Sequence, residues 1–198
     1  MRRDEPEPKG WTPVQDAQNA ASLLVLLAQA LAAPVEPILR SRFGSRYFGL
    51  PSLLGFLAVP MWMLAWPGED PGPLLTFWAL AIAMQLVARV QAFRMMVRGD
   101  IVHSRFNGYP RLARVLKRTP QHRINAAVEP WLVMGVGVLL LAVSEPLGSF
   151  LMASGASLAI VAGVIEAAQR RRALSMHDAW LEQQELAERF REITDWRR

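Results

Sequence analysis

The chain has 198 residues, of which 52% are hydrophobic, and a net charge of +5. It contains no cysteine, which excludes disulfide bonds, thiolate metal sites and cysteine nucleophiles. Its hydrophobic fraction is close to that of soluble domains, but the apolar residues are gathered into long uncharged runs separated by charged segments. This distribution predicts an all-α membrane protein.

Residues 1–48 are predicted to form a cytoplasmic tail followed by a short helix. The tail is acidic and rich in proline directly after two arginines, which is not the pattern of a signal peptide. The helix ends where Pro34 and Pro37 interrupt the pattern. Its apolar part is about a dozen residues long, whereas a membrane span needs roughly 20. We therefore expect an interfacial or re-entrant helix here, with a complete crossing by residues 20–34 as the alternative.

Residues 49–168 are predicted to form a bundle of four transmembrane helices. The expected spans are about 50–66, 74–93, 127–143 and 147–168. A polar loop, residues 94–128, separates the second span from the third, and a short turn joins the third to the fourth as a helical hairpin. Four spans of this kind predict a multi-pass membrane protein.

Residues 169–198 have the pattern of an amphipathic helix. At 100° per residue, one side of this helix is apolar, and its candidate docking residues are Met176, Trp180, Leu186, Phe190 and Ile193. The opposite side is mostly acidic, whereas a helix that lies on an anionic membrane normally has a basic polar face. The apolar side is therefore predicted to bind protein: a partner, a second copy or the cytoplasmic loop of the same chain.

The positions of the basic residues predict the orientation in the membrane. None of the 22 lysines and arginines lies in the two expected outer loops, residues 67–73 and 144–146, and only Arg89 lies within a span. The positive-inside rule then places both termini and the loop 94–128 in the cytoplasm. We expect the cytoplasmic (inner) membrane of a bacterium. Because topology already accounts for the basic excess, no nucleic acid partner is expected.

A few polar residues fall within the expected spans, where ionisable groups are uncommon and are functional candidates by default. The predicted intramembrane polar cluster comprises Gln85, Arg89, Glu129 and Glu166. These residues either line a path for an ion or a proton, or pair with one another and fix the packing of the helices. The second interpretation, in which Arg89 and Glu166 pair or extend to the interface, is favoured because these two residues and Glu129 lie toward the cytoplasmic ends of their helices.

Two further surfaces stand out. The fourth span has small residues at a spacing of four, which allow another helix to approach closely; they are Gly155, Ala159 and Gly163. Contact within the hairpin is favoured over contact with a partner. The cytoplasmic loop contains a short basic stretch after Pro110, interpreted as an amphipathic helix on the anionic inner leaflet. Its candidate headgroup contacts are Arg111, Arg114, Lys117 and Arg118.

Residues that suggest chemistry are few. Asp100, His103 and Ser104 have the residue types of a nucleophilic site, but they sit within five positions and no second feature supports them. The three histidines lack the spacing that puts two metal ligands on one helix face. No cofactor or metal is expected, and an enzyme is disfavoured.

Three functions follow in order of preference. The first is a structural or assembly subunit of a larger membrane complex, which docks partners through its loop and C-terminal helix. The second is a small homo-oligomeric channel or transporter. The third is an enzyme that acts on lipid at the membrane interface.

Overall fold

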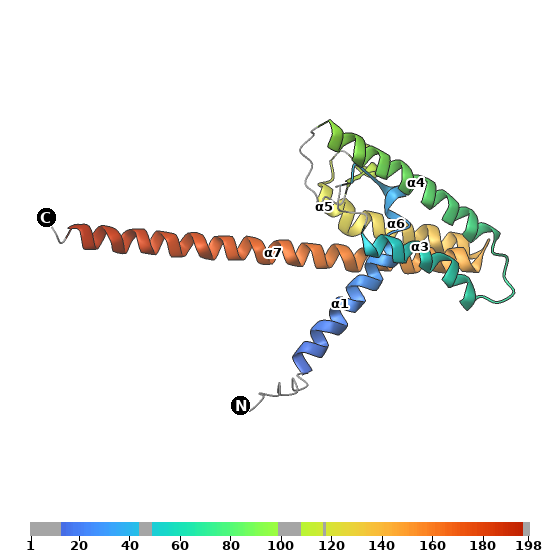
Figure 1. Cartoon of the computed structure of the whole chain (residues 1–198), viewed down its shortest axis with the longest axis horizontal. Helices are drawn as coiled ribbons and strands as arrows, with labels where there is room; N and C mark the ends of the chain where they lie inside the picture. The colour runs from blue at the N-terminus through green and yellow to red at the C-terminus, as the bar shows by residue number, and fades with distance from the viewer. Residues whose placement is uncertain (1–12, 44–48, 99–107, 117, 196–198) are drawn as a thin grey trace, which may run out of the picture. The chain divides into compact units, whose positions relative to one another are not determined.

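Helices make up almost all of the structure, a computed structural model that describes residues 13–43, 49–98, 108–116 and 118–195 (Figure 1). In chain order the helices are α1 (Pro13–Ala32), α2 (Glu36–Leu39), α3 (Leu50–Trp62), α4 (Gly72–Val97), α5 (Gln121–Arg123), α6 (Glu129–Leu141) and α7 (Glu145–Asp195). The shorter elements are β1 (Arg40–Ser41), η1 (Met63–Ala65), β2 (Tyr109–Pro110), η2 (Arg111–Arg114) and η3 (Ile124–Val128). The chain divides into two units, Met1–Val161 and Ala162–Arg198.

Three helices are long and apolar enough to cross a membrane: Gly72–Val97, Gln121–Leu141 and Glu145–Arg191. They include the second, third and fourth predicted spans, so the all-α fold is confirmed together with three candidates for membrane crossing. The first predicted span falls on Leu50–Ala65, an apolar helix of only 16 residues. A complete crossing needs roughly 20.

Two helix boundaries differ from the prediction. The helix of the third span begins at Gln121 and passes through the π-helical turn η3 before α6. Pro130 has no backbone N–H and its ring crowds the preceding turn, which is a common reason for such an irregularity. The fourth span and the C-terminal helix form one continuous helix, α7, where a break near residue 168 was expected. The sequence from Val164 to Asp195 contains neither glycine nor proline, so nothing there ends the helix.

Helices α6 and α7 form a tightly packed antiparallel hairpin. Glycines allow this contact, because added Cβ atoms would collide with the backbone of the opposite helix. A Cβ on Gly137 would lie 2.8 Å from the Met152 nitrogen, and one on Gly155 would lie 2.9 Å from the Pro130 oxygen. The hairpin therefore depends on backbone-to-backbone approach at two levels.

Helix α1 approaches α3 just as closely. A Cβ on Gly55 would overlap the backbone oxygen of Ala30. In the last turn of α1, Ala30 and Ala32 are buried, whereas Leu23 and Leu24 nearer its start are exposed. Only the C-terminal part of α1 thus belongs to the core.

Side chains from several helices fill two apolar clusters. The first contains Ala32, Val35, Val133, Leu151 and Leu158. In the second, Phe150 of α7 lies against Val59 and Leu74, and its ring makes an edge contact with Trp62 at 5.8 Å between centroids. These clusters join α1, α3, α4, α6 and α7 within the first unit.

Two hydrogen bonds fix how α3 lies along α4. Ser52, in the first turn of α3, accepts a 2.6 Å hydrogen bond from Gln85 Nε2, and Gln85 is 13 residues after the first residue of α4. Trp78 Nε1 donates to the Phe56 oxygen at 2.9 Å, nearer the α3–α4 loop. Helix α3 therefore begins opposite the middle of α4 and runs along one half of it.

Candidate functional site

A short strand pair holds the segment after α1 in place. Strands β1 and β2 pair antiparallel, with Arg40 opposite Pro110 and Ser41 opposite Tyr109. Gly108 precedes β2 with φ +81°, a conformation that favours glycine, and a Cβ there would lie 3.0 Å from the Ser41 oxygen. The chain thus brings the part of the loop that contains β2 onto the segment that follows α1.

Arg111 reinforces this junction from η2. Its Nε donates to the Arg40 oxygen and its Nη2 to the Pro37 oxygen, each at 3.4 Å. Both acceptors are backbone groups. Arg111, a predicted contact for lipid headgroups, is exposed and also makes these two contacts within the protein.

The junction places Arg40 inside the first unit, where it meets two carboxylates. Arg40 is 3% exposed and Glu129 is 0% exposed. Arg40 Nε donates a hydrogen bond to Glu129 Oε2 at 2.8 Å. Arg40 Nη2 lies 2.7 Å from the same oxygen. Glu36 Oε1 lies 3.8 Å from Nη1 of the same guanidinium. We call Glu36, Arg40 and Glu129 the buried charge cluster.

Glu36 is the electrostatically unusual member of this cluster. Burial raises the pKa of its carboxyl from 4.5 to about 7, because the surroundings disfavour the charged form. Arg40 lowers this pKa and Glu129 raises it further, both with smaller effects than burial. The carboxyl is therefore poised to gain or lose a proton close to neutral pH.

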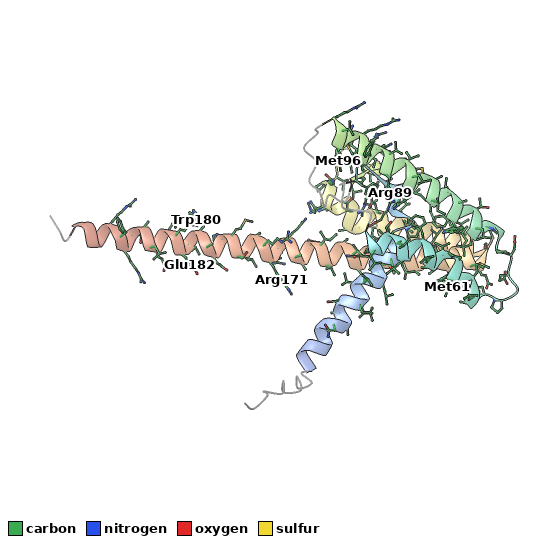
Figure 2. All side chains as sticks on the ribbon, viewed as in Figure 1. Met61, Arg89, Met96, Arg171, Trp180 and Glu182 are labelled. Carbon is green, nitrogen blue, oxygen red and sulfur yellow. The ribbon has the colours of Figure 1, made fainter. Side chains whose placement is uncertain are left out.

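The residues predicted as an intramembrane polar cluster have different surroundings in the structure. Glu129 belongs to the buried charge cluster, and Gln85 is buried with its amide bonded to Ser52. Arg89 and Glu166 are exposed on α4 and α7, and Figure 2 shows Arg89 on α4. Glu166 belongs to the second unit, so its pairing with Arg89 stays a prediction.

The sequence analysis missed Glu36 and the structural role of Arg40. From the sequence alone, Arg40 is one of several basic residues that follow the first apolar helix. The available signal was the sequence from Val35 to Arg40, in which a glutamate and an arginine four positions apart stand among apolar residues and a proline. This spacing allows the two side chains to meet on one turn.

Two residues of the predicted small-residue row, Gly155 and Ala159, belong to the first unit, and Gly163 belongs to the second. Gly155 lies against Pro130 and Met134 of α6. Ala159 is exposed, and no atom lies within 4 Å of a Cβ added to Gly163. Among the described residues, close helix contact in this row is thus made at Gly155.

The basic stretch of the loop also differs from expectation. The helix expected from residue 111 to residue 118 is replaced, in the described part, by the single 3₁₀ turn η2. Pro110 and Pro120 leave little room for a longer helix. Arg114 and Arg118 are exposed, and Lys117 lies outside the described residues.

The second unit is a helical segment with exposed side chains. Residues 166–191 are exposed throughout, including four of the five predicted docking residues, Met176, Trp180, Leu186 and Phe190. The Trp180 ring stacks on His177 with 6.1 Å between centroids, and Figure 2 shows Trp180 and Glu182 on this helix. The side chain of Ile193, the fifth, lies outside the described residues.

The candidate catalytic residues Asp100, His103 and Ser104 all fall within residues 99–107, outside the described part of the chain. Where side chains are described, no group of three or more histidine or acidic residues is arranged to hold a metal ion.

Comparison with known proteins finds no matching family model, curated protein or solved structure.

Proposed function

We propose that the protein is an integral membrane subunit that assembles with a protein partner through the helical segment of its second unit. The observation that carries this proposal is the apolar stripe formed by Met176, Trp180, Leu186 and Phe190. Phe190 is 72% exposed and Trp180 is 52% exposed. Aromatic side chains that remain this exposed on one face of a helix commonly mark a protein contact.

The charges beside the stripe favour protein over lipid. Between Met176 and Arg191 the helix contains four acidic residues and two arginines. An anionic bilayer surface would repel this segment, whereas interfacial helices normally carry a basic polar face. The expected occupant is a helix of a partner protein whose apolar face is bordered by basic residues.

The proposed arrangement in the membrane agrees with this role. The positive-inside rule puts the segment, both termini and the loop 94–128 on the cytoplasmic side of a bacterial inner membrane. The partner would therefore be a cytoplasmic protein or the cytoplasmic part of another membrane protein. The three long apolar helices serve as the anchor.

Two leucines on the same helix provide a matched test. Leu186 lies within the stripe, whereas Leu181 lies about 140° around the helix from Met176, and both are exposed. We expect Leu186→Glu to abolish the complex with the partner and Leu181→Glu to preserve it, because only the first puts a charge into the contact. Native mass spectrometry of gently extracted membranes measures the mass and composition of the complex.

Phe190→Glu is expected to behave like Leu186→Glu, with insertion into the membrane unchanged in all three variants. A complex of the same mass and composition in all three would contradict the proposal. A complex that contains only copies of this chain and is lost in Leu186→Glu would show that the stripe binds a second copy instead of a different protein.

A homo-oligomeric channel or transporter is the second candidate, and the buried charge cluster favours it. Charged groups within a membrane bundle are costly and often belong to ion or proton pathways. The cluster combines Glu36 and Arg40 with Glu129, which is eight residues into the apolar helix Gln121–Leu141. Measurement of ion or proton flux in liposomes containing the purified chain tests this alternative.

A further inference from the structure

Two carboxylates share one guanidinium in the buried charge cluster, and the sharing is unequal. Two nitrogens of Arg40 approach Glu129 Oε2 at 2.8 and 2.7 Å, within hydrogen-bond distance. Glu36 Oε1 lies 3.8 Å from Nη1 of the same guanidinium, which is beyond a hydrogen bond. Arg40 is thus the ion-pair partner of Glu129, and the charge of Glu36 is compensated only weakly.

If both glutamates were ionised, the cluster would carry a net charge of −1 at a site from which water is almost excluded. Glu36 is 5% exposed and its two neighbours are buried more deeply. An uncompensated charge in such surroundings is expensive, and the usual outcome is that the group becomes neutral. A single bound positive charge would restore the balance.

Two acceptor atoms nearby also lack a donor. Oε1 of Glu129 and Oδ1 of Asn125 are buried, and neither has a hydrogen-bond partner among the described residues. They lie on the same helix, four positions apart. A protonated carboxyl carries an O–H donor, whereas an ionised carboxylate only accepts. One of these acceptors, Glu129 Oε1, belongs to the buried charge cluster, which therefore contains a buried acceptor without a donor.

The other charged groups on the elements that pack against α2 do not neutralise Glu36. On α4 these are Arg89 and Arg94, both exposed. Arg42 follows β1 and is exposed, and Arg111 directs two nitrogens to backbone oxygens. The charged groups that act on the Glu36 carboxyl are Arg40 and Glu129.

We propose that Glu36 is a proton-binding site, neutral while Arg40 is paired with Glu129 and ionised when the proton leaves. Loss of the proton makes two carboxylates compete for one guanidinium, which weakens the link between the β1 segment and α6. The carboxyl pKa of about 7 agrees with proton exchange in the physiological range. The site lies in the first unit, and the helix stripe proposed to bind a partner lies in the second.

Infrared difference spectroscopy tests the proposal on the full chain in lipid nanodiscs. We expect a protonated-carboxyl band that disappears with a midpoint near neutral pH as pH is raised from about 5 to about 9. Glu36→Gln should remove this titrating band. Glu69→Gln, which changes an exposed glutamate, should leave it unchanged.

Glu129→Gln provides a variant that shifts the midpoint without removing the group. It releases Arg40 to pair with Glu36, so the midpoint should fall below that of the unmodified chain. A merely structural glutamate that stays in one protonation state would show no such movement. Exchange of choline for sodium in the buffer should leave the midpoint in place.

Thermal unfolding in detergent gives an independent readout. Because the raised pKa favours the proton-bound folded state, the contribution of Glu36 to stability is fully present below about pH 4.5 and is lost as pH rises to about 7. As pH rises from about 4.5 to about 7, the melting temperature of Glu36→Gln should therefore increase relative to that of the unmodified chain. Above about pH 7 the difference between the two melting temperatures should stay constant. In the infrared measurement, a titrating band that persists in Glu36→Gln would overturn the proposal, and so would the absence of any titrating band. A midpoint that depends on sodium would show that the site binds a metal cation instead of a proton.

Discussion

Arg40 holds together parts of the chain that are far apart in sequence. Its backbone pairs with β2 while its side chain binds Glu129, 89 positions later. Removing one member of a buried ion pair leaves the other charge without compensation, which typically costs about 3–5 kcal/mol. We expect Arg40→Ala to destabilise the bundle by this amount, as measured by unfolding in detergent.

Arg94→Ala is the control, because Arg94 is exposed and its removal should change the unfolding free energy by less than about 0.5 kcal/mol. The double variant Arg40→Met with Glu129→Leu should recover much of the stability, since it removes both charges and leaves apolar side chains of similar size. Equal losses in Arg40→Ala and Arg94→Ala would contradict this role of Arg40.

At the level of single residues, the sequence indicated part of the cluster. Glu129 was a candidate because an ionisable residue at the start of an expected span is uncommon. Arg40 was not chosen, because a basic residue after a short apolar helix is also typical of a membrane boundary. Only the fold distinguishes these cases, since the turn at Pro34 and the strand pair direct Arg40 inward.

Among the helices, close packing and helix propensity make opposite predictions for two glycines of α7. A Cβ on Gly155 would meet Met134 and Pro130 of α6 at distances down to 2.5 Å, whereas a Cβ on Gly163 meets nothing within 4 Å. We expect Gly155→Ala to destabilise the bundle by about 1–3 kcal/mol through overpacking. Gly163→Ala should stabilise the helix by about 0.5–1 kcal/mol.

Unfolding in detergent measures both changes, and Gly135→Ala serves as a second open-space control on α6. Equal destabilisation by Gly155→Ala and Gly163→Ala would show that the small-residue row packs against another helix along its whole length. In that case Gly163 would belong to an interface with a partner or a second copy.

The long helices were predictable because an apolar run near 20 residues has few other structures open to it. The elements that were missed carry weaker signals. Strands β1 and β2 have two residues each, and no periodic pattern can be read from two positions. The continuity of α7 was missed because the change from apolar to charged composition suggested a boundary, although the backbone meets no helix breaker there.

For the whole molecule, the register of α3 along α4 bears on how α1 is placed in the membrane. Sixteen residues of helix span about 24 Å, less than the hydrocarbon core of roughly 30 Å. Because α3 starts opposite the middle of α4, it covers the half nearer the α3–α4 loop. The end of α1 packs beside Gly55, and α2 contacts α4. We infer that α1 enters the bundle partway and that the chain turns back at Pro34.

A chain without cysteine makes this topology directly testable, since each introduced thiol is unique. Asn19→Cys, Glu69→Cys and Ser175→Cys each place a thiol at an exposed position. If α1 is re-entrant, a membrane-impermeant maleimide added to intact cells should label Glu69→Cys alone, and inverted vesicles should label the other two. Detergent-solubilised samples, in which all three should react, control for accessibility. Labelling of Asn19→Cys from the same side as Glu69→Cys would instead mean that α1 crosses the membrane completely. The N-terminus would then lie outside, and the buried charge cluster would have to lie between two complete spans.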